Sequence, residues 1–365
     1  MKKYNTELYR VDYNLIEDNK LEALKKHKAV KEAAELLRNG EVVAFPTETV
    51  YGLGADATNE GAVERIYLAK GRPQDNPLIV HISTLEQLTE ITEGKVSTMV
   101  KVIIDEFWPG PLTVILNKNE VIPDRTTAGL DSVAVRMPAH PLARALIEQT
   151  GKPIAAPSAN ISGAPSPTRA FHVMNDLKGR IPLILDGGSS WVGVESTVID
   201  ARNDQLVILR PGGISREEIG KVLDSQQLIK AGVKMDSGLS GEENGINIEK
   251  PRSPGMKYRH YSPETPLYII ESEQKLSEIL DKGVDRSIGF ILSTETYNKY
   301  QSQLDGLKIV EMGSQKAPDI IAAKLYDILR SIDKLSLESA YIESIPQEGI
   351  GEAVMNRISK ASSRE

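Results

Sequence analysis

Residues 28–45 read KAVKEAAELLRNGEVVAF and introduce the alternation of helix and strand that organises most of the chain. Apolar residues in the first half recur at the spacing of one helical face, and Gly40 is a residue type that commonly ends a helix. The next residues, EVVAF, form a short apolar run of the length of a buried strand. A helix followed at once by a strand indicates an α/β domain.

The same alternation continues over residues 28–225. Helices are predicted near 62–69, 85–91, 96–107, 142–149, 169–177 and 216–223, and strands at 78–82, 112–116, 133–137, 154–156, 183–185, 197–199 and 206–209. Several late strands follow one another without a helix between them, which favours some antiparallel pairing within a mixed sheet.

The remainder of the chain divides into three further parts. Residues 1–27 form an N-terminal extension, and residues 226–264 contain a stretch rich in Gly, Ser and acidic residues that is typical of a linker. Residues 265–365 alternate strictly between strand and helix, which predicts a small, Rossmann-like parallel sheet. This last part contains no obvious reactive cluster.

Composition limits the chemistry that the chain can perform. Its 365 residues suit two soluble domains, and the lack of cysteine excludes disulfides, thiolate catalysis and cysteine-ligated metal centres. A net charge of -7 argues against a surface built mainly to coat nucleic acid. No apolar run approaches a membrane span of about 20 residues and no secretory signal is recognisable, so a cytoplasmic location without a membrane partner is expected.

The first polar motif is PTETVYGLGADA at residues 46–57. Gly52, Gly54 and Ala57 partly match a dinucleotide-binding fingerprint, but no helix follows at once, and a glycine-rich turn between strands is the better prediction. The triplet TET at 47–49 offers hydroxyls and a carboxylate to a cleft.

The second motif, AKGRPQDNPLIVHI at 69–82, places Lys70 and Arg72 at a helix end. Cations there are often only partners of the helix dipole, but the prolines on either side of Asn76 restrict the loop in a way that suits phosphate ligands. His81 ends the following strand and is either a ligand or a half-buried strand residue with a satisfied ring.

Four further stretches bring polar groups to strand ends. In SVAVRMPAHP, Ser132 and Arg136 share one strand face, and the guanidinium needs a carboxylate partner from a ligand or from the protein. Residues 153–168, PIAAPSANISGAPSPT, suit either an ordinary loop or an anion-binding nest. VESTVID and LRPGGIS contribute a serine and an arginine.

Several common catalytic patterns are missing from the sequence. Neither a Walker A, an HExxH nor a GxSxG pattern occurs, and no tight His/Asp/Glu spacing predicts a metal site. The cations and hydroxyls at strand ends instead suit a site that binds a polyphosphate together with a small amino or carboxy compound.

Taken in order, PTETVYGLGADA, KGRPQDNPLIVHI, SVAVRMPAHP, PSANISGAPSPT, ESTVID and LRPGGI resemble the YrdC-like domain of the threonylcarbamoyl-AMP synthase family. SPGMKYRHYSP followed by an α/β module resembles the two-domain form of that family. The resemblance implies a YrdC-like catalytic domain at 28–225, with a twisted, mixed, open sheet and helices around a positive cleft. Residues 226–264 would form a linker that acts as an active-site lid, and 265–365 the C-terminal α/β domain.

The resemblance also implies an activity. Family members make threonylcarbamoyl-AMP from L-threonine, bicarbonate and ATP with Mg²⁺, which binds mainly through the ATP phosphates, and they release pyrophosphate. The product serves threonylcarbamoyladenosine formation next to the anticodon of tRNA. Transient contacts with tRNA and with the threonylcarbamoyl-transferase complex are therefore expected.

The site residues carry over position by position. The polar tetrad of the cleft, with the expected catalytic residues first, would be Lys70, Arg72, Ser158 and Asn160. ATP contacts would fall on Arg72, Asn76, Ser132, Ser158, Asn160, Ser166, Arg210 and Tyr261. L-Threonine contacts would fall on Thr49, His81, Arg136, Ser196 and the backbone of Ala156.

A lid hypothesis follows for residues 250–263, KPRSPGMKYRHYSP. Tyr261 would close over the nucleotide while Lys257, Arg259 and His260 face the phosphates, which would keep water from the labile product.

Two other readings of the sequence place the cleft in a different role. The cleft could hold tRNA or double-stranded RNA in a non-catalytic subunit of a modification complex, although the acidic net charge and the shortage of aromatic residues in the cleft motifs disfavour this. Carbamoyl transfer in hydrogenase maturation uses a similar domain, but it would need zinc-finger segments that a chain without cysteine lacks.

Overall fold

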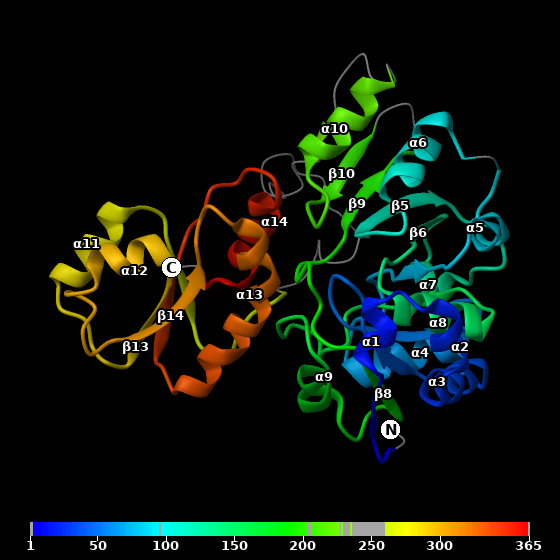
Figure 1. Cartoon of the computed structure of the whole chain (residues 1–365), viewed down its shortest axis with the longest axis horizontal. Coiled ribbons are helices and arrows are strands. Elements are labelled where there is room, and N and C mark those ends of the chain that lie inside the picture. Colours follow the sequence, from blue (N-terminus) through cyan, green and yellow to red (C-terminus); the bar gives the residue numbers. More distant parts are fainter. Residues whose placement is uncertain are drawn as a thin grey trace.

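The computed structural model describes residues 3–94, 96–202, 206–226, 228, 234–235 and 260–363, which form two α/β domains (Figure 1). The elements of the large domain are β1 (Glu7–Arg10), α1 (Tyr13–Glu17), α2 (Leu21–Lys26), α3 (Lys28–Arg38), β2 (Val43–Phe45), β3 (Gly52–Asp56), α4 (Glu60–Lys70), β4 (Ile79–His81), α5 (Leu85–Ile91), α6 (Thr98–Phe107), β5 (Leu112–Asn117), α7 (Asp124–Thr127), β6 (Ser132–Arg136), α8 (Pro141–Thr150), β7 (Ile154–Ala155), α9 (Ala170–Leu177), β8 (Leu183–Asp186), β9 (Thr197–Asp200), β10 (Val207–Arg210), α10 (Arg216–Ser225) and β11 (Lys234–Met235). Among these residues, no helix combines the length and the apolar character needed to cross a membrane.

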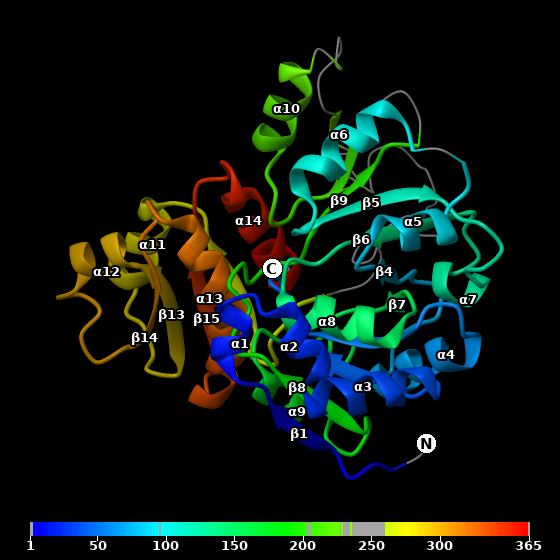
Figure 2. The ribbon, with the colours of Figure 1, turned by 45° about the vertical axis from the view of Figure 1, so that its right-hand side comes forward.

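The sheet of the large domain mixes parallel and antiparallel pairs. Its strands, counted over the described residues, follow the order β1-β8-β2-β3-β7-β4-β6-β5-β9-β10-β11. β4 is parallel to β6 and antiparallel to β7, which confirms the predicted mixed sheet. β1 pairs with β8, so part of the N-terminal extension is an edge strand of this sheet. Helices α2, α3 and α8 pack side by side (Figure 2).

Residues 46–57 differ from the predicted glycine-rich turn. Gly52–Asp56 form β3, which runs antiparallel to β2, so the prediction is wrong for the second half of the motif. A Cβ added to Gly54 would lie 2.7 Å from the ring of Phe45 and 2.8 Å from the side chain of Ile154. The glycine therefore allows side chains of two neighbouring strands to pack over it, which also leaves no basis for a dinucleotide fingerprint.

The second domain has the predicted architecture. Its elements are β12 (Leu267–Ile270), α11 (Glu273–Asp281), β13 (Ile288–Ser293), α12 (Thr294–Tyr300), β14 (Lys308–Gly313), α13 (Pro318–Ile332), a 3₁₀ turn (Asp333–Leu335), β15 (Ser339–Glu343) and α14 (Ile350–Ala361). Its strands are all parallel, in the order β12-β15-β13-β14. Figures 1 and 2 show α13 and α14 on the face of this sheet that is turned toward the large domain.

The two domains share a hydrophobic cluster. Val50 and Val194 of the large domain belong to the same group of buried side chains as Ile321 and Leu325 of α13. At Gly193 the chain approaches α13 so closely that an added Cβ would lie 2.3 Å from the carbonyl oxygen of Ala322. The second domain is therefore packed directly against the loop that precedes β9.

Candidate active site

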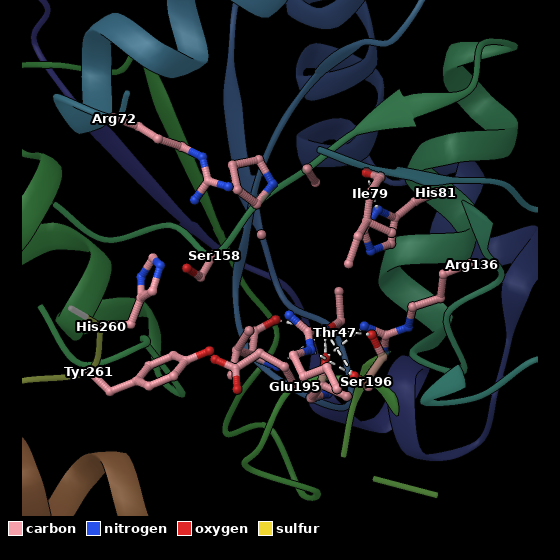
Figure 3. Close-up of a pocket in the computed structure, with 16 residues that line it drawn as sticks. Thr47, Arg72, Ile79, His81, Arg136, Ser158, Glu195, Ser196, His260 and Tyr261 are labelled. Carbon is pink, nitrogen blue, oxygen red and sulfur yellow. Dashed lines mark hydrogen bonds between the residues drawn. The ribbon is translucent and has the colours of Figure 1, made fainter. Parts of the chain in front are cut away.

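A cavity opens where loops at the ends of several strands of the large sheet meet His260 and Tyr261, shortly before the second domain (Figure 3). The empty volume between its walls, including the part that is open to solvent, is about 610 Å³. It is lined by Thr47, Thr49, Val50, Gly52, Arg72, Ile79, His81, Arg136, Ala156, Pro157, Ser158, Glu195, Ser196, Arg210, His260 and Tyr261.

Most of the residues predicted for the site line this cavity. Those that do are Thr49, Arg72, His81, Arg136, Ala156, Ser158, Ser196, Arg210 and Tyr261, and those that do not are Lys70, Asn76, Ser132, Asn160 and Ser166. Figure 3 shows Arg72, Ser158, His260 and Tyr261 on one side of the cavity and His81 and Arg136 on the other.

Arg136 is held at one end of the cavity by a buried network. Its Nη2 lies 2.6 Å from Oε1 of Glu48, its Nη1 donates to Oγ1 of Thr49 over 2.8 Å, and its Nε donates to the carbonyl of Gly110 over 3.2 Å. Thr49 is in turn 2.8 Å from Oγ1 of Thr47. The guanidinium therefore has a protein carboxylate partner, and a ligand carboxylate would have to share it with Glu48.

His81 lies beside Arg136 in the floor of the cavity. Its Nδ1 is 3.2 Å from the carbonyl oxygen of Ile79, a contact that favours a proton on Nδ1. Burial, together with the nearby charge of Arg136, lowers the pKa of His81 to about 3. The ring is therefore neutral near pH 7 and can exchange hydrogen bonds with a ligand, but it is a weak base.

Buried polar atoms without a hydrogen-bond partner in the described structure occur on the opposite side as well as beside Arg136, where Oε2 of Glu48 has none. Among the described residues, Nε of Arg72, Oδ1 of Asn76 and Nε2 of His260 are buried without a hydrogen-bond partner. Within the described part of the chain, the hydrogen bonds of the Arg72 side chain are long, at 3.5 Å to the carbonyl of Asn76 and 3.3 Å to that of Pro77. Buried polar atoms without partners are costly, so this wall is prepared to bind a polar ligand.

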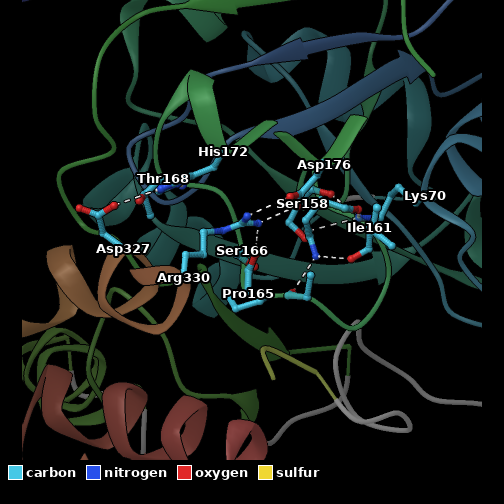
Figure 4. A network of polar contacts seen from close by, with 12 residues as sticks. Lys70, Ser158, Ile161, Pro165, Ser166, Thr168, His172, Asp176, Asp327 and Arg330 are labelled. Atoms are coloured by element: carbon cyan, nitrogen blue, oxygen red, sulfur yellow. Dashed lines mark hydrogen bonds and ion pairs between the residues drawn. The ribbon is translucent and has the colours of Figure 1, made fainter. Parts of the chain in front are cut away.

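Lys70 does not reach the cavity because the loop at 157–168 occupies its ammonium group (Figure 4). Its Nζ donates to the carbonyl oxygens of Ser158 (2.5 Å) and Asn160 (2.6 Å) and lies 3.3 Å from Oδ1 of Asn160. The amide nitrogen of Asn160 donates to the carbonyls of Ile161 and Ala164 over 2.8 Å. Both side chains therefore shape the loop that presents Ser158 to the cavity.

The second domain holds the other end of the same loop. Arg330 of α13 donates to the carbonyl of Pro165 and forms a bidentate ion pair with Asp176 of α9, at 2.9 and 2.7 Å (Figure 4). His172 of α9 lies 3.1 Å from Asp327 of α13. The loop is thus fixed from two sides by buried or half-buried cations.

Ser196 and Arg210 meet below the cavity. Nη2 of Arg210 donates to the carbonyl oxygen of Ser196 over 2.9 Å and lies 3.2 Å from its Oγ, while Oγ1 of Thr113 is 2.7 Å from that Oγ. Ser132 stands apart, at the start of β6, where it pairs with Asn117 of β5.

Glu195 is the cavity residue whose importance the sequence does not reveal. Ser166 Oγ donates to it over 2.7 Å, the hydroxyl of Tyr326 lies 2.9 and 2.8 Å from its two oxygens, and Nε of Arg357 donates to it over 2.8 Å. Burial would raise the pKa of Glu195, but the charges of Arg357 and Arg210 and these hydrogen bonds outweigh burial and lower it to about 2. A lone glutamate in a strand-like motif gives no signal of such contacts, because Arg357 lies 162 residues away in the chain.

The structure describes two of the four residues that the lid hypothesis names. His260 and Tyr261 line the cavity, whereas Lys257 and Arg259 lie outside the described residues. Tyr261 is buried and its ring centroid is 5.4 Å from that of Tyr326.

Known proteins resemble the chain over nearly its whole length. The family described as "Telomere recombination" matches residues 35–212, and the family described as "Threonylcarbamoyl-AMP synthase, C-terminal domain" matches residues 214–363. Threonylcarbamoyl-AMP synthase of Bacillus subtilis is 48% identical over 337 residues, which cover 91% of this chain and 92% of the relative. The synthase of Pyrococcus abyssi is 43% identical over 342 residues, with 91% and 94% covered.

A solved structure agrees with the sequence matches. The crystal structure of Pyrococcus abyssi Sua5 complexed with L-threonine superposes on this chain with a TM-score of 0.82 and 40% sequence identity, covering 98% of this chain and 96% of that one. The match includes both domains. The resemblance inferred from the motifs is confirmed, and the chain belongs to the threonylcarbamoyl-AMP synthase family.

Proposed function

We propose that the chain is a nucleotidyltransferase that makes threonylcarbamoyl-AMP from L-threonine, bicarbonate and ATP and releases pyrophosphate. The observation that carries this proposal is one cavity with two unlike ends. One end holds a buried arginine among hydroxyls, and the other holds Arg72, Arg210 and Tyr261 with unpaired polar atoms nearby. The first end suits a small amino acid, and the second suits a nucleoside triphosphate.

L-Threonine would bind at the end formed by Arg136. Its carboxylate would accept hydrogen bonds from the guanidinium, and its hydroxyl and amine would find neutral partners in Thr49, Ser196 and the neutral ring of His81. Ala156, at the cavity wall, would contribute through its carbonyl group, because its N–H already donates to the carbonyl of Ile79 over 2.9 Å.

The nucleotide would bind on the side of Arg72. Arg72 and Arg210 would neutralise phosphate charge, Ser158 would donate from its loop, and the Tyr261 ring would cover the nucleotide. Asn76 would contribute through its unpaired Oδ1. Lys70, Asn160 and Ser166, which lie behind this wall, would act by holding the loop and Glu195 in place.

In the proposed reaction the neutral threonine amine adds to carbon dioxide formed from bicarbonate and loses a proton to give a carbamate. A carbamate oxygen then bonds to the α-phosphorus of ATP while the bond to the bridging oxygen of the β-phosphate breaks, and pyrophosphate leaves. With a pKa of about 3, His81 is poorly suited to remove the amine proton, so solvent or bicarbonate would take it. Catalysis is then mostly positioning and electrostatic stabilisation.

We further propose that Mg²⁺ enters with ATP as part of the substrate. Over the described ranges, no three His, Asp or Glu side chains lie together as a metal ion would need, and the one carboxylate in the cavity wall is engaged by Arg357. The product would supply tRNA modification, with transient contacts to tRNA and the transferase complex in the cytoplasm.

Pyrophosphate release tests the proposal. Release should require L-threonine, bicarbonate and Mg·ATP together, and equal release without threonine would reject the synthase activity. Arg72→Ala should lose release by at least about 100-fold, because a phosphate-neutralising charge is removed. Arg65→Ala is the matched control, since Arg65 lies on α4, the helix that ends two residues before Arg72, is 44% exposed and pairs with Glu41 away from the cavity. ATP left unconsumed by the intact protein would favour the RNA-binding alternative.

A further inference from the structure

Two residues of the second domain form part of the wall behind the cavity. Tyr326 of α13 and Arg357 of α14 are both completely buried, and both contact Glu195, which lines the cavity. Nη1 of Arg357 also donates to the carbonyl of Pro211, over 2.7 Å, next to Arg210. The second domain thus touches the two segments that carry the cavity residues Glu195 and Arg210.

The same two residues form the seat of Tyr261. The Tyr261 ring lies with its centroid 5.4 Å from the Tyr326 ring and 5.7 Å from the guanidinium carbon of Arg357. Tyr261 has φ of 67°, a left-handed backbone conformation that a tyrosine rarely adopts, and it is only 6% exposed. Such a conformation persists only where the surroundings enforce it, and here they are an aromatic ring and a cation beneath the tyrosine.

Holding the domains together does not by itself account for this arrangement. Other polar contacts already join the domains, among them Arg330 with Asp176, Arg169 with Asp327 and Arg216 with Glu352. These pairs lie away from the cavity lining, whereas the contact between Arg357 and Glu195 lies at it. A buried ion pair also adds little net stability to a domain interface, because removing both charges from water costs about as much free energy as their attraction returns.

We propose that Tyr326 and Arg357 are positioning residues, which Glu195 holds in place and which fix Tyr261 where nucleotide binding requires it, so that the second domain is a working part of the active site. The proposal rests on the proposed function, since it assigns the nucleotide to the side of the cavity that Tyr261 covers. It predicts that Tyr326 and Arg357 affect the binding of ATP through Tyr261 and do not affect the binding of L-threonine at Arg136.

The test uses full-length variants. Tyr326→Phe removes only the hydroxyl that meets Glu195, and Arg357→Met removes the cation below Tyr261, while Arg357→Met with Glu195→Gln avoids an unpaired buried carboxylate. Arg216→Gln is the matched control, because it breaks the half-exposed pair with Glu352 of the same helix α14. Melting temperature and circular dichroism verify folding.

Kinetics give the first readout. We expect the KM for ATP to rise about 10-fold in Tyr326→Phe and more in the Arg357 variants, with the dissociation constant of L-threonine, measured by calorimetry without ATP, within 2-fold of the parent protein. Arg357→Met added to Tyr261→Ala should cause no further rise, because its effect passes through Tyr261. Equal effects of Arg216→Gln, or additive effects in the Tyr261→Ala background, would overturn the proposal.

Hydrogen exchange gives a readout that needs no catalysis. Amides of residues 260–265 should exchange at least 10-fold faster in Arg357→Met with Glu195→Gln than in Arg216→Gln, in protein without ligand. If the intact protein were inactive but the difference in exchange rate were still observed, the proposed function would be rejected and the positioning role of Tyr326 and Arg357 would be supported. If exchange were unchanged in an active enzyme, the seat would fail alone.

Discussion

At the scale of single residues, some side chains line the cavity and could contact a ligand, whereas others only hold the lining residues in place. Arg136 and Arg72 belong to the first group, Lys70 and Arg357 to the second. The distinction comes from which donors are already occupied, and it leads to two predictions.

Arg136→Lys should weaken L-threonine binding about 10- to 100-fold and leave ATP binding unchanged. A lysine cannot reproduce the fork that now contacts Glu48, Thr49 and Gly110, and a lost charge-assisted hydrogen bond is worth about 1.5–3 kcal/mol, or one to two decades in affinity. Calorimetry with each ligand measures both quantities in one variant. Unchanged threonine affinity would place the carboxylate elsewhere.

Lys70→Met and Arg72→Ala should both abolish pyrophosphate release but differ in stability. Lys70→Met leaves the carbonyls of Ser158 and Asn160 without their donor and should lower the free energy of unfolding by about 2–4 kcal/mol. Arg72→Ala loses only contacts of 3.3 Å or longer and should change it by less than about 1 kcal/mol. Urea unfolding compares them, and equal destabilisation would contradict the separate roles.

Sequence reasoning succeeded for residues whose chemistry is visible locally. Polar side chains shortly after apolar strands, such as Thr49 and Ser158, could be assigned to a cleft because strand ends meet at a sheet edge. The ion-pair partners of Glu48 and Arg357 could not be predicted, since they lie 88 and 162 residues away along the chain and only folding brings them together. The ligand roles themselves remain predictions.

At the scale of elements, predictability followed the apolar pattern. Helices and strands with a clear apolar period, such as α3 and β5, lie close to their predicted positions. β3 was missed because its glycines imitate a turn, whereas their function is to let Phe45 pack against the strand. Propensity cannot distinguish a glycine that bends a chain from one that admits a neighbour.

Gly193→Ala tests how closely the loop before β9 packs on α13. A methyl group there would lie 2.3 Å from backbone atoms of Ala322 and Ala323, and the residue has φ of 76°. The helix must move, so we expect a loss of about 3 kcal/mol or more in the free energy of unfolding together with a higher KM for ATP.

Gly151→Ala is the control for the backbone contribution alone. Gly151 has φ of 71° with open space around its Cα, so it should lose only about 1–2 kcal/mol and keep its KM. Equal losses in the two variants would show that the approach of the loop to α13 is looser than the geometry indicates.

At the scale of the whole molecule, composition and motif order were enough to predict a mixed large sheet and a parallel small one. The order of strands was not, because β1 reaches its partner β8 across more than 170 residues and pairing at that range leaves no local pattern. The docking of α13 and α14 on the cavity wall was equally invisible, although it decides how the second domain takes part in the site.

Four buried or half-buried histidines, three in the large domain and His260 at the cavity, predict how the stability of the molecule depends on pH. Burial is the main cause that lowers the pKa of His140 and His172 to about 4 and of His81 and His260 to about 3. An unfolded histidine has a pKa near 6.5. Between these values the unfolded chain binds more protons than the folded chain, so each histidine favours unfolding as the pH falls below about 6.5.

The expected loss for His140 alone is about 3 kcal/mol when the pH falls from 7 to 4, at about 1.4 kcal/mol for each unit of pKa difference. Nδ1 of His140 accepts the N-cap hydrogen bond from the N–H of Leu142, and an asparagine side chain can accept the same bond. His140→Asn should therefore fold, and its free energy of unfolding should depend less steeply on pH. His27→Asn controls for the cap exchange itself, since His27 accepts the same bond from Ala29 at the start of α3. Urea unfolding at pH 7.5, 6.5 and 5.5 measures the slopes, and a His140→Asn line parallel to that of the parent protein would show that this buried ring does not set the acid limit of the fold.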